Sequence, residues 1–228
     1  MNVGMRLSAV AADMPDRMAV AVPGKRTGPA TRSYDQVTFA QLQQDSDQIA
    51  AGFQAMGIPA GTRIVLAVPP SIEFVSLVFA MLKAGLVMVL IDPGMGRKNV
   101  LRCLEEAEPE GFVGIPLVHA MRLLFRKRFP QARYNVTVGR RWCWGGTTLK
   151  KMRQSVGRAL RAPDTGPDDP AAIIFTTGST GPPKGVLYRH QNFCSQVDEI
   201  RDFYDIQPGE IDLPGFPLFA LFNSVMGV

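Results

Sequence analysis

Residues 171–185 read Ala-Ala-Ile-Ile-Phe-Thr-Thr-Gly-Ser-Thr-Gly-Pro-Pro-Lys-Gly, a short apolar run that passes directly into a loop of glycines, hydroxyls and prolines. The apolar run predicts a buried strand, because such runs bounded by turn residues are typical of sheets covered on both faces. The glycines allow backbone N–H groups to converge on an anion. The hydroxyls add donors and Lys184 adds a positive charge. The stretch therefore predicts a binding site for a polyphosphate.

The alternative for residues 176–185 is an ordinary Ser/Thr/Gly turn with an exposed lysine. The combination argues against that alternative, because an ordinary turn does not require three glycines, four hydroxyls, two prolines and a lysine directly after an apolar strand. A Walker A loop is excluded, because it needs Gly-Lys-Ser/Thr and here Lys184 precedes Gly185. The loop also lacks the Gly-x-Gly-x-x-Gly fingerprint of dinucleotide-binding folds and the Gly-x-Ser-x-Gly elbow of α/β-hydrolases.

Upstream of this stretch, predicted strands alternate with predicted helices. Thr38 and Ser71 are candidate N-caps, and Gly57 and Gly85 are candidate stops. The predicted elements are a helix at 38–56, a strand at 63–68, a helix at 71–83, a strand at 87–91, a helix at 97–107 and a strand at 111–115. This pattern predicts an α/β fold with a mostly parallel sheet flanked by helices. A Pro/Gly/Asp loop at 160–170 leads into the strand at 171–175.

Residues 74–91 are nearly long enough and apolar enough to span a bilayer, which takes roughly 20 residues. Lys83 at the middle and Gly85 just after it favour a buried helix followed by a short strand instead. Residues 1–16 lack the charged start and apolar core of a signal peptide. We therefore expect no transmembrane segment.

The cysteines are three in number and far apart, which argues against a disulfide framework and against zinc. With only two histidines in the chain, no metal site built from side chains is expected. Reduced cysteines favour a cytoplasmic location.

The charge of +5 is unevenly distributed, since residues 111–163 contain no Asp or Glu but many basic residues. Such a segment can attract phosphates, acidic lipids or an acidic protein, or it can be an ordinary solvated face. The basic residues of this segment are Arg122, Arg126, Lys127, Arg128, Arg133, Arg140, Arg141, Lys150, Lys151, Arg153, Arg158 and Arg161. No recognised nucleic-acid motif accompanies them, and Trp142 and Trp144 are as compatible with a core as with base stacking, so no nucleic-acid partner is expected.

The loop at 176–185 resembles the signature of the adenylate-forming superfamily, which contains acyl-CoA synthetases, luciferases and the adenylation domains of peptide synthetases. That signature has the form Thr-Ser/Thr-Gly-Ser-Thr-Gly-x-Pro-Lys-Gly, and this sequence matches it throughout. Further stretches that resemble the superfamily are 38–42 with Ser46-Asp47, 72–74, 82–85, 90–93 and 186–192, which includes His190. The resemblance covers about residue 38 to the end, with the basic segment as its weakest part.

Three stretches resemble a narrower group, the β-lactone synthetases of bacterial long-chain olefin biosynthesis, which are similar to fatty-acid-CoA ligases. These stretches are 90–98, 105–112 and 212–222. Many acyl-CoA synthetases carry Pro-Leu-Phe-His where this chain has Pro217-Leu218-Phe219-Ala220. The methyl group of Ala220 would suit a substrate wall for a branched lipid chain formed with Pro217 and Phe219, although 213–222 could equally be an ordinary apolar core strand.

The resemblance implies an AMP-forming ligase that uses ATP and Mg²⁺ to convert a fatty-acid carboxylate to an acyl-adenylate. Lys184 and Thr176 would be its catalytic residues. The residues implied to hold the phosphates are Thr176, Thr177, Gly178, Ser179, Thr180, Gly181, Lys184 and Gly185. The narrower resemblance implies that a 2-alkyl-3-hydroxy fatty acid is closed to a β-lactone with release of AMP and pyrophosphate, alongside other enzymes of the same lipid pathway.

By the same resemblance, residues 1–228 form an incomplete N-terminal part of the AMP-binding large domain, without the small C-terminal domain. We expect such a fragment to be inactive alone and to expose an unfinished sheet. A long-chain acyl-CoA ligase is the alternative within the enzyme class. A non-catalytic fragment that binds only nucleotide or a partner is the alternative of another class.

Overall fold

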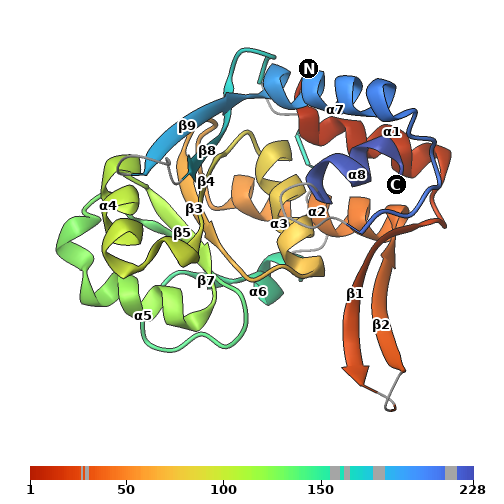
Figure 1. Cartoon of the computed structure of the whole chain (residues 1–228). Helices are drawn as coiled ribbons and strands as arrows, with labels where there is room; N and C mark the ends of the chain where they lie inside the picture. Colours follow the sequence, from red (N-terminus) through yellow and green to blue (C-terminus); the bar gives the residue numbers. More distant parts are fainter. Residues whose placement is uncertain (27, 29–30, 155–159, 162–164, 177–182, 214–219) are drawn as a thin grey trace.

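A seven-stranded sheet runs through the molecule, with strands in the order β7-β6-β5-β3-β4-β8-β9 (Figure 1). The computed structural model describes residues 1–26, 28, 31–154, 160–161, 165–176, 183–213 and 220–228. All neighbouring strands are parallel except β8 and β9, which are antiparallel. The strands are β3 (Arg63–Ala67), β4 (Val87–Ile91), β5 (Gly111–Gly114), β6 (Tyr134–Thr137), β7 (Thr147–Thr148), β8 (Pro170–Thr176) and β9 (Lys184–Arg189). The prediction of a mostly parallel α/β sheet is confirmed.

Helices cover both faces of this sheet, as Figure 1 shows for α4 and α5 on one side and α2 and α3 on the other. The α-helices are α1 (Arg6–Asp13), α2 (Phe39–Ala55), α3 (Ile72–Lys83), α4 (Arg97–Ala107), α5 (Pro116–Leu124), α6 (Leu149–Arg153), α7 (His190–Tyr204) and α8 (Ala220–Met226). Short 3₁₀ helices are η1 (Val3–Met5), η2 (Pro93–Met95) and η3 (Arg126–Arg128). The predicted helices at 38–56, 71–83 and 97–107 are α2, α3 and α4, each within one residue of its predicted ends.

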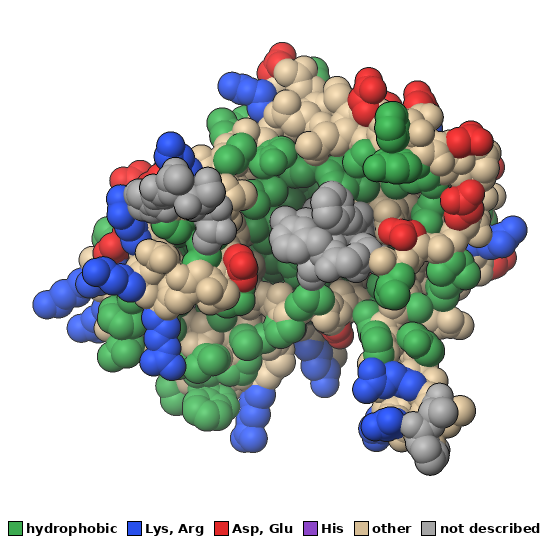
Figure 2. Space-filling model, viewed as in Figure 1, with side chains coloured by type: hydrophobic (Ala, Val, Ile, Leu, Met, Phe, Trp, Pro, Cys, Tyr) green, Lys and Arg blue, Asp and Glu red, His purple; other side chains and the backbone are tan. Residues whose placement is uncertain are grey.

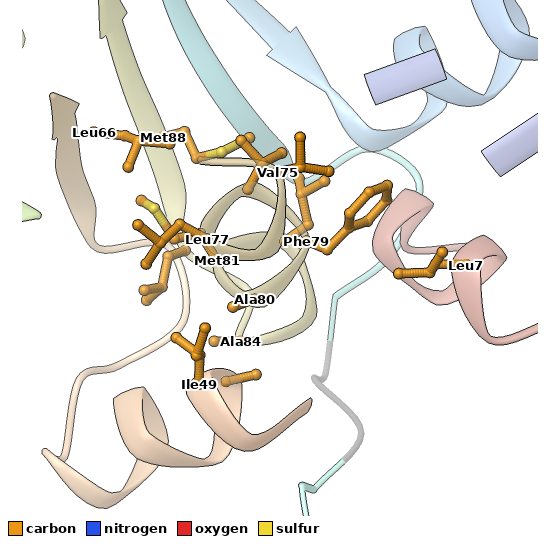
Figure 3. Packing of buried hydrophobic residues seen from close by; sticks show 14 of the residues in the cluster. Leu7, Ile49, Leu66, Val75, Leu77, Phe79, Ala80, Met81, Ala84 and Met88 are labelled. Atoms are coloured by element: carbon orange, nitrogen blue, oxygen red, sulfur yellow. The ribbon is translucent and has the colours of Figure 1, made fainter. Parts of the chain in front are cut away.

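The alternating side chains of the central strands fill two separate cores. Leu66 of β3 and Met88 of β4 belong to the larger core, which packs against α1, α2 and α3 (Figure 3). Their neighbours Val65 and Val89 belong to the smaller core on the other face, together with Phe112 of β5. Both faces of β3 and β4 are therefore buried, which explains why these strands are continuously apolar.

The predicted caps set the ends of α2 and α3. Thr38 Oγ1 accepts a hydrogen bond from the Gln41 N–H at 3.2 Å, and Gln41 Oε1 accepts one from the Thr38 N–H at 2.9 Å. Ser71 Oγ accepts from the Phe74 N–H at 3.1 Å. Gly85 ends α3 with a φ of 71°, a left-handed conformation in which glycine carries no Cβ penalty. Residues 74–91 thus divide into helix and strand, and no helix in the described part of the chain could cross a membrane.

A buried lysine joins α3 to α2. Lys83 is fully buried, and its Nζ donates to Gln43 Oε1 at 2.7 Å, Ser46 Oγ at 2.8 Å and Asp47 Oδ1 at 2.8 Å. Burial lowers the pKa of Lys83, while the hydrogen bond and charge of Asp47 act against that shift. All three ammonium protons are therefore used, and the ion pair is part of the contact between the two helices.

Other parts of the fold were not predicted. The hairpin of β1 (Met18–Arg26) and β2 (Arg32–Thr38) projects from the body of the molecule (Figure 1), and no residue of either strand is fully buried. In the basic segment, α5, β6, β7 and α6 were missed. The alternative of a core strand at 213–222 is wrong where the structure describes it, because Leu213 is exposed and α8 begins at Ala220. Residues 214–219 lie outside the described residues.

The ion pair between Lys83 and Asp47 predicts that the two residues contribute unequally to the free energy of unfolding. Asp47→Ala leaves a buried ammonium without its counter-charge, which should lower the free energy of unfolding by about 3–5 kcal/mol. Lys83→Met removes the charge and keeps an apolar stem, while Asp47 stays partly open to water, so the loss should be smaller. Urea denaturation of both variants measures the difference, with exposed Asp35→Ala as a near-neutral control. A Lys83→Met variant less stable than Asp47→Ala would contradict this account.

Candidate functional site

The ends of β8 and β9 bring the two predicted catalytic residues together. In the antiparallel ladder Thr176, the last residue of β8, lies opposite Lys184, the first residue of β9. Directly opposed residues in such a ladder have Cβ atoms about 4.5–5.5 Å apart. Both residues are exposed. A hydroxyl and an ammonium group thus stand side by side at the open end of a buried strand.

The remaining predicted phosphate ligands divide into one that the structure places and five that it does not. Gly185 lies opposite Phe175 in the same ladder. The predicted phosphate ligands Thr177, Gly178, Ser179, Thr180 and Gly181 lie outside the described residues, so their role stays a prediction. The strand pair therefore provides the frame from which the loop starts and to which it returns.

Gly185 is needed for packing. A Cβ at this position would lie 3.0 Å from Phe175 Cζ and 3.2 Å from Ile173 Cγ2. The Phe175 side chain is buried in the smaller core. A side chain at 185 would therefore push on the ring of Phe175, in the residue just before Thr176.

Asp92, which was not predicted as a site residue, belongs to the same edge of the sheet. Ile91 at the end of β4 pairs with Phe175 in parallel register, so Asp92 and Thr176 are the next residues of neighbouring strands. Asp92 is exposed, and its Oδ1 accepts a hydrogen bond from the Gly94 N–H at 2.8 Å. The carboxyl ends of parallel strands are where ligands bind in open α/β sheets. The motif Leu90-Ile91-Asp92-Pro93 was the signal that could have identified it.

His190, by contrast, lies at the other end of β8. Arg189 pairs with Pro170, the first residue of β8, and His190 follows it at the start of α7. Its side chain is fully buried, and Nδ1 accepts from the Val3 N–H at 3.4 Å, so the ring proton is on Nε2. Burial lowers the pKa of His190 to about 4, against an attraction by Asp169. The geometry makes His190 a neutral packing residue that joins η1 to α7.

The predicted substrate wall is only partly described. Pro217 and Phe219 lie outside the described residues, and Ala220 is placed only as the first residue of α8. Behind α8 an apolar cavity of about 10 Å³ is lined by Phe79, Phe193 and Phe222, among others. It is at the lower limit for one water molecule and cannot hold an acyl chain. The substrate wall therefore stays a prediction.

A larger hollow lies away from the sheet edge. This groove of about 760 Å³ is lined by residues of α1 and α2, including Ser8, Gln43 and Asp47. Two of these side chains bind Lys83. The groove exposes the acceptors that hold this lysine, and it lies apart from Thr176 and Lys184.

Comparison with known proteins agrees with this architecture. The sequence profile of the family described as "AMP-binding enzyme" matches residues 7–223, and the chain belongs to this family. It is 46% identical over its whole length to an olefin beta-lactone synthetase of Xanthomonas campestris pv. campestris, covering 41% of that protein. It is 29% identical over 203 residues, 84% of this chain and 39% of the other, to a long-chain-fatty-acid–CoA ligase of Mycobacterium tuberculosis.

A solved structure supports the fold. The Mycobacterium smegmatis MbtA structure superposes with a TM-score of 0.82 at 22% identity, over all of this chain and 42% of the other. The chain spans about two fifths of the length of the curated relatives it matches. These comparisons establish the family and the fold of this chain. They do not establish the activity of the longer proteins for it.

The packing of Gly185 predicts that Gly185→Ala is destabilising. The added methyl group should cost about 1–3 kcal/mol, because Phe175 must move within a packed core. Thermal or urea unfolding measures this loss. Gly166→Ala is the matched control, since the nearest atom to its Cβ is at 3.8 Å and its φ is not positive. Equal stability of the two variants would show that Phe175 yields without cost.

The buried His190 predicts acid sensitivity. Its pKa is lowered from 6.5 to about 4, so between these values the unfolded chain binds more protons than the folded one. Stability is therefore full above pH 6.5 and falls as the pH decreases, by about 3 kcal/mol at pH 4. His190→Gln should lower stability at pH 7 and flatten this dependence. Urea unfolding of both proteins across this range gives the comparison, and parallel profiles would exclude His190 as the cause.

Proposed function

We propose that residues 1–228 form the N-terminal part of the large AMP-binding domain of an ATP-dependent, adenylate-forming enzyme. Family membership and the opposed Thr176 and Lys184 at the carboxyl edge of a parallel sheet support this proposal. The relatives are more than twice as long as this chain, which supports a small C-terminal domain outside residues 1–228. The three cysteines are all free, which favours the cytoplasm as the site of activity.

In this proposal Lys184 and Thr176 bind the β- and γ-phosphates of ATP, together with Thr177, Gly178, Ser179, Thr180, Gly181 and Gly185. A carboxylate oxygen attacks the α-phosphorus, the bond to the bridging oxygen breaks, and pyrophosphate leaves. Charge then builds on the departing group, and a positioned ammonium and hydroxyl stabilise it. The chemistry of the two described side chains fits a polyphosphate.

Magnesium is proposed to enter with the nucleotide. Mg²⁺ binds through one or two carboxylates together with substrate phosphates and keeps several of its waters. Among the described residues, no group of three or more His, Cys, Asp and Glu side chains could hold a metal ion.

The substrate we propose is a 2-alkyl-3-hydroxy fatty acid. The observation that carries this choice is the 46% identity to an olefin beta-lactone synthetase over the whole chain. The 3-hydroxyl oxygen attacks the adenylated carbonyl carbon and gives up its proton, the bond to AMP breaks, and a four-membered lactone forms. Pro217, Phe219 and Ala220 would line the acyl site, and other enzymes of the same lipid pathway would be partners.

Two alternatives remain. A long-chain acyl-CoA ligase is favoured by the 29% identity to a fatty-acid–CoA ligase, and it differs in needing CoA. A non-catalytic fragment that binds only nucleotide or a partner is the alternative of another class. The three possibilities differ in their product: a β-lactone, an acyl-CoA or none.

The test joins this chain to the segment that follows the matched part of the Xanthomonas relative and supplies ATP, Mg²⁺ and the hydroxy acid without CoA. We expect the lactone by NMR together with AMP. Lys184→Met should lower the rate about 10²–10³-fold, as loss of one transition-state donor does. Lys150→Met, an exposed lysine of α6, is the matched control and should keep the full rate.

The other results separate the alternatives. Product that forms only with CoA identifies a ligase. If the joined protein binds nucleotide but shows no turnover, the non-catalytic alternative is favoured. The 228-residue chain alone should release no pyrophosphate, and acid-dependent release from it would contradict the proposed division of the enzyme.

A further inference from the structure

Helix α5 turns polar side chains toward the protein and leucines toward solvent. His119 and Arg122 are buried, with His119 Nε2 3.0 Å from the Val136 carbonyl oxygen and Arg122 Nη2 donating to the Trp144 carbonyl at 3.0 Å. Leu117 and Leu124, by contrast, are 74% and 78% exposed. Residues seven apart lie on one face of a helix. The outward face of α5 is therefore apolar.

Trp142 extends this apolar face. It is 66% exposed, and its ring lies 5.7 Å from that of Trp144, which in turn stacks on His119 of α5 at 5.8 Å. Trp144 is buried, and its indole N–H donates to Thr137 Oγ1 at 2.9 Å. The stack thus anchors Trp142 beside α5. We call Leu117, Leu123, Leu124 and Trp142 the α5 surface.

Basic side chains border the α5 surface. Arg126 and Lys127 begin η3, one residue after the end of α5, and Arg140 and Arg141 directly precede Trp142; all four are exposed. Figure 2 shows hydrophobic side chains gathered over the region where Figure 1 places α5, with Lys and Arg side chains around them. Residues 111–163 contain no acidic residue, so this segment itself supplies no counter-charge. Arg128, next in the chain, is paired with Glu105 of α4 at 3.0 Å.

Exposed leucines, an interfacial tryptophan and a basic border together match the surface of an acidic membrane. Leucines lower their free energy by leaving water for the acyl region, and tryptophan favours the headgroup level. Each nearby Lys or Arg is attracted by anionic headgroups. A nucleic acid would gain nothing from exposed aliphatic side chains. We propose that the α5 surface binds membranes that contain acidic phospholipids, as a peripheral contact.

Vesicle flotation tests this proposal with the 228-residue chain, without nucleotide or fatty acid, so the result is independent of the proposed reaction. We expect the chain to float with vesicles of phosphatidylcholine and phosphatidylglycerol and to bind phosphatidylcholine vesicles far more weakly. Raising the salt concentration should weaken the binding, because the headgroup attraction is screened.

Two paired variants separate charge from apolar contact. Arg140→Gln with Arg141→Gln should lower the partition coefficient about fivefold for each arginine removed. Leu117→Gln with Leu124→Gln should also lower it. The matched controls are Lys25→Gln with Arg32→Gln on the β1–β2 hairpin and Phe203→Gln with Tyr204→Gln on α7, all exposed. Thermal unfolding confirms that each variant is folded.

Equal loss in the variants and their controls would overturn the proposal, because binding would then lie elsewhere. Equal binding to both kinds of vesicle would overturn the role of the acidic headgroup. A chain that binds a DNA duplex and neither kind of vesicle would make the basic border a nucleic-acid site instead.

Discussion

The pairing of β8 with β4 is the constraint on which the rest of the structure depends. Ala172 pairs with Met88 and Phe175 with Ile91, so the strand that carries Thr176 is held inside the sheet rather than at its edge. Ala171 and Ala172 are fully buried, and their small side chains let the larger core pack closely against the strand. With β9 on its other side, β8 delivers Thr176 to a fixed point beside Asp92. A fixed position lowers the cost of binding a ligand, because Thr176 need not be ordered at each binding event.

The elements of the sheet centre could be predicted because local signals and burial agree there. Thr38, Ser71 and Gly85 mark helix ends through their own backbone chemistry, and β3 and β4 are apolar because both faces are covered. The loop at 176–185 was predicted from its sequence motif, and of its predicted phosphate ligands the structure describes Thr176, Lys184 and Gly185. The neighbourhood of Asp92 was not predictable, since it depends on the order of strands across the sheet. The exclusion of His190 from the site has the same origin, because only the ladder shows that it lies at the opposite end of β8.

The basic segment shows that helical periodicity in a sequence does not by itself identify the side of a helix that is buried. In α5 the apolar and polar positions have helical spacing, but the most deeply buried side chains are His119 and Arg122, because the Val136 and Trp144 carbonyl oxygens lie beneath them. A pattern alone carries no information on which face meets such acceptors. The β1–β2 hairpin was missed for a related reason, since a ribbon that stands away from the body buries little on either face. Lys83 illustrates the opposite case: its charge argued correctly against a membrane span, but its partners on α2 became visible only in three dimensions.

The strand order also has a consequence for how this chain folds. The β8–β9 ladder joins residues close in sequence, whereas α4, β5, α5, β6, β7 and α6 lie between β4 and β8 along the chain. Closing so long an intervening loop has an entropic cost that must be met before the contacts form, which slows folding. Until β8 inserts, β4 has an open edge. Because Thr176 and Lys184 lie at the ends of β8 and β9, a chain in which β8 has not yet paired with β4 lacks the frame of the predicted phosphate loop.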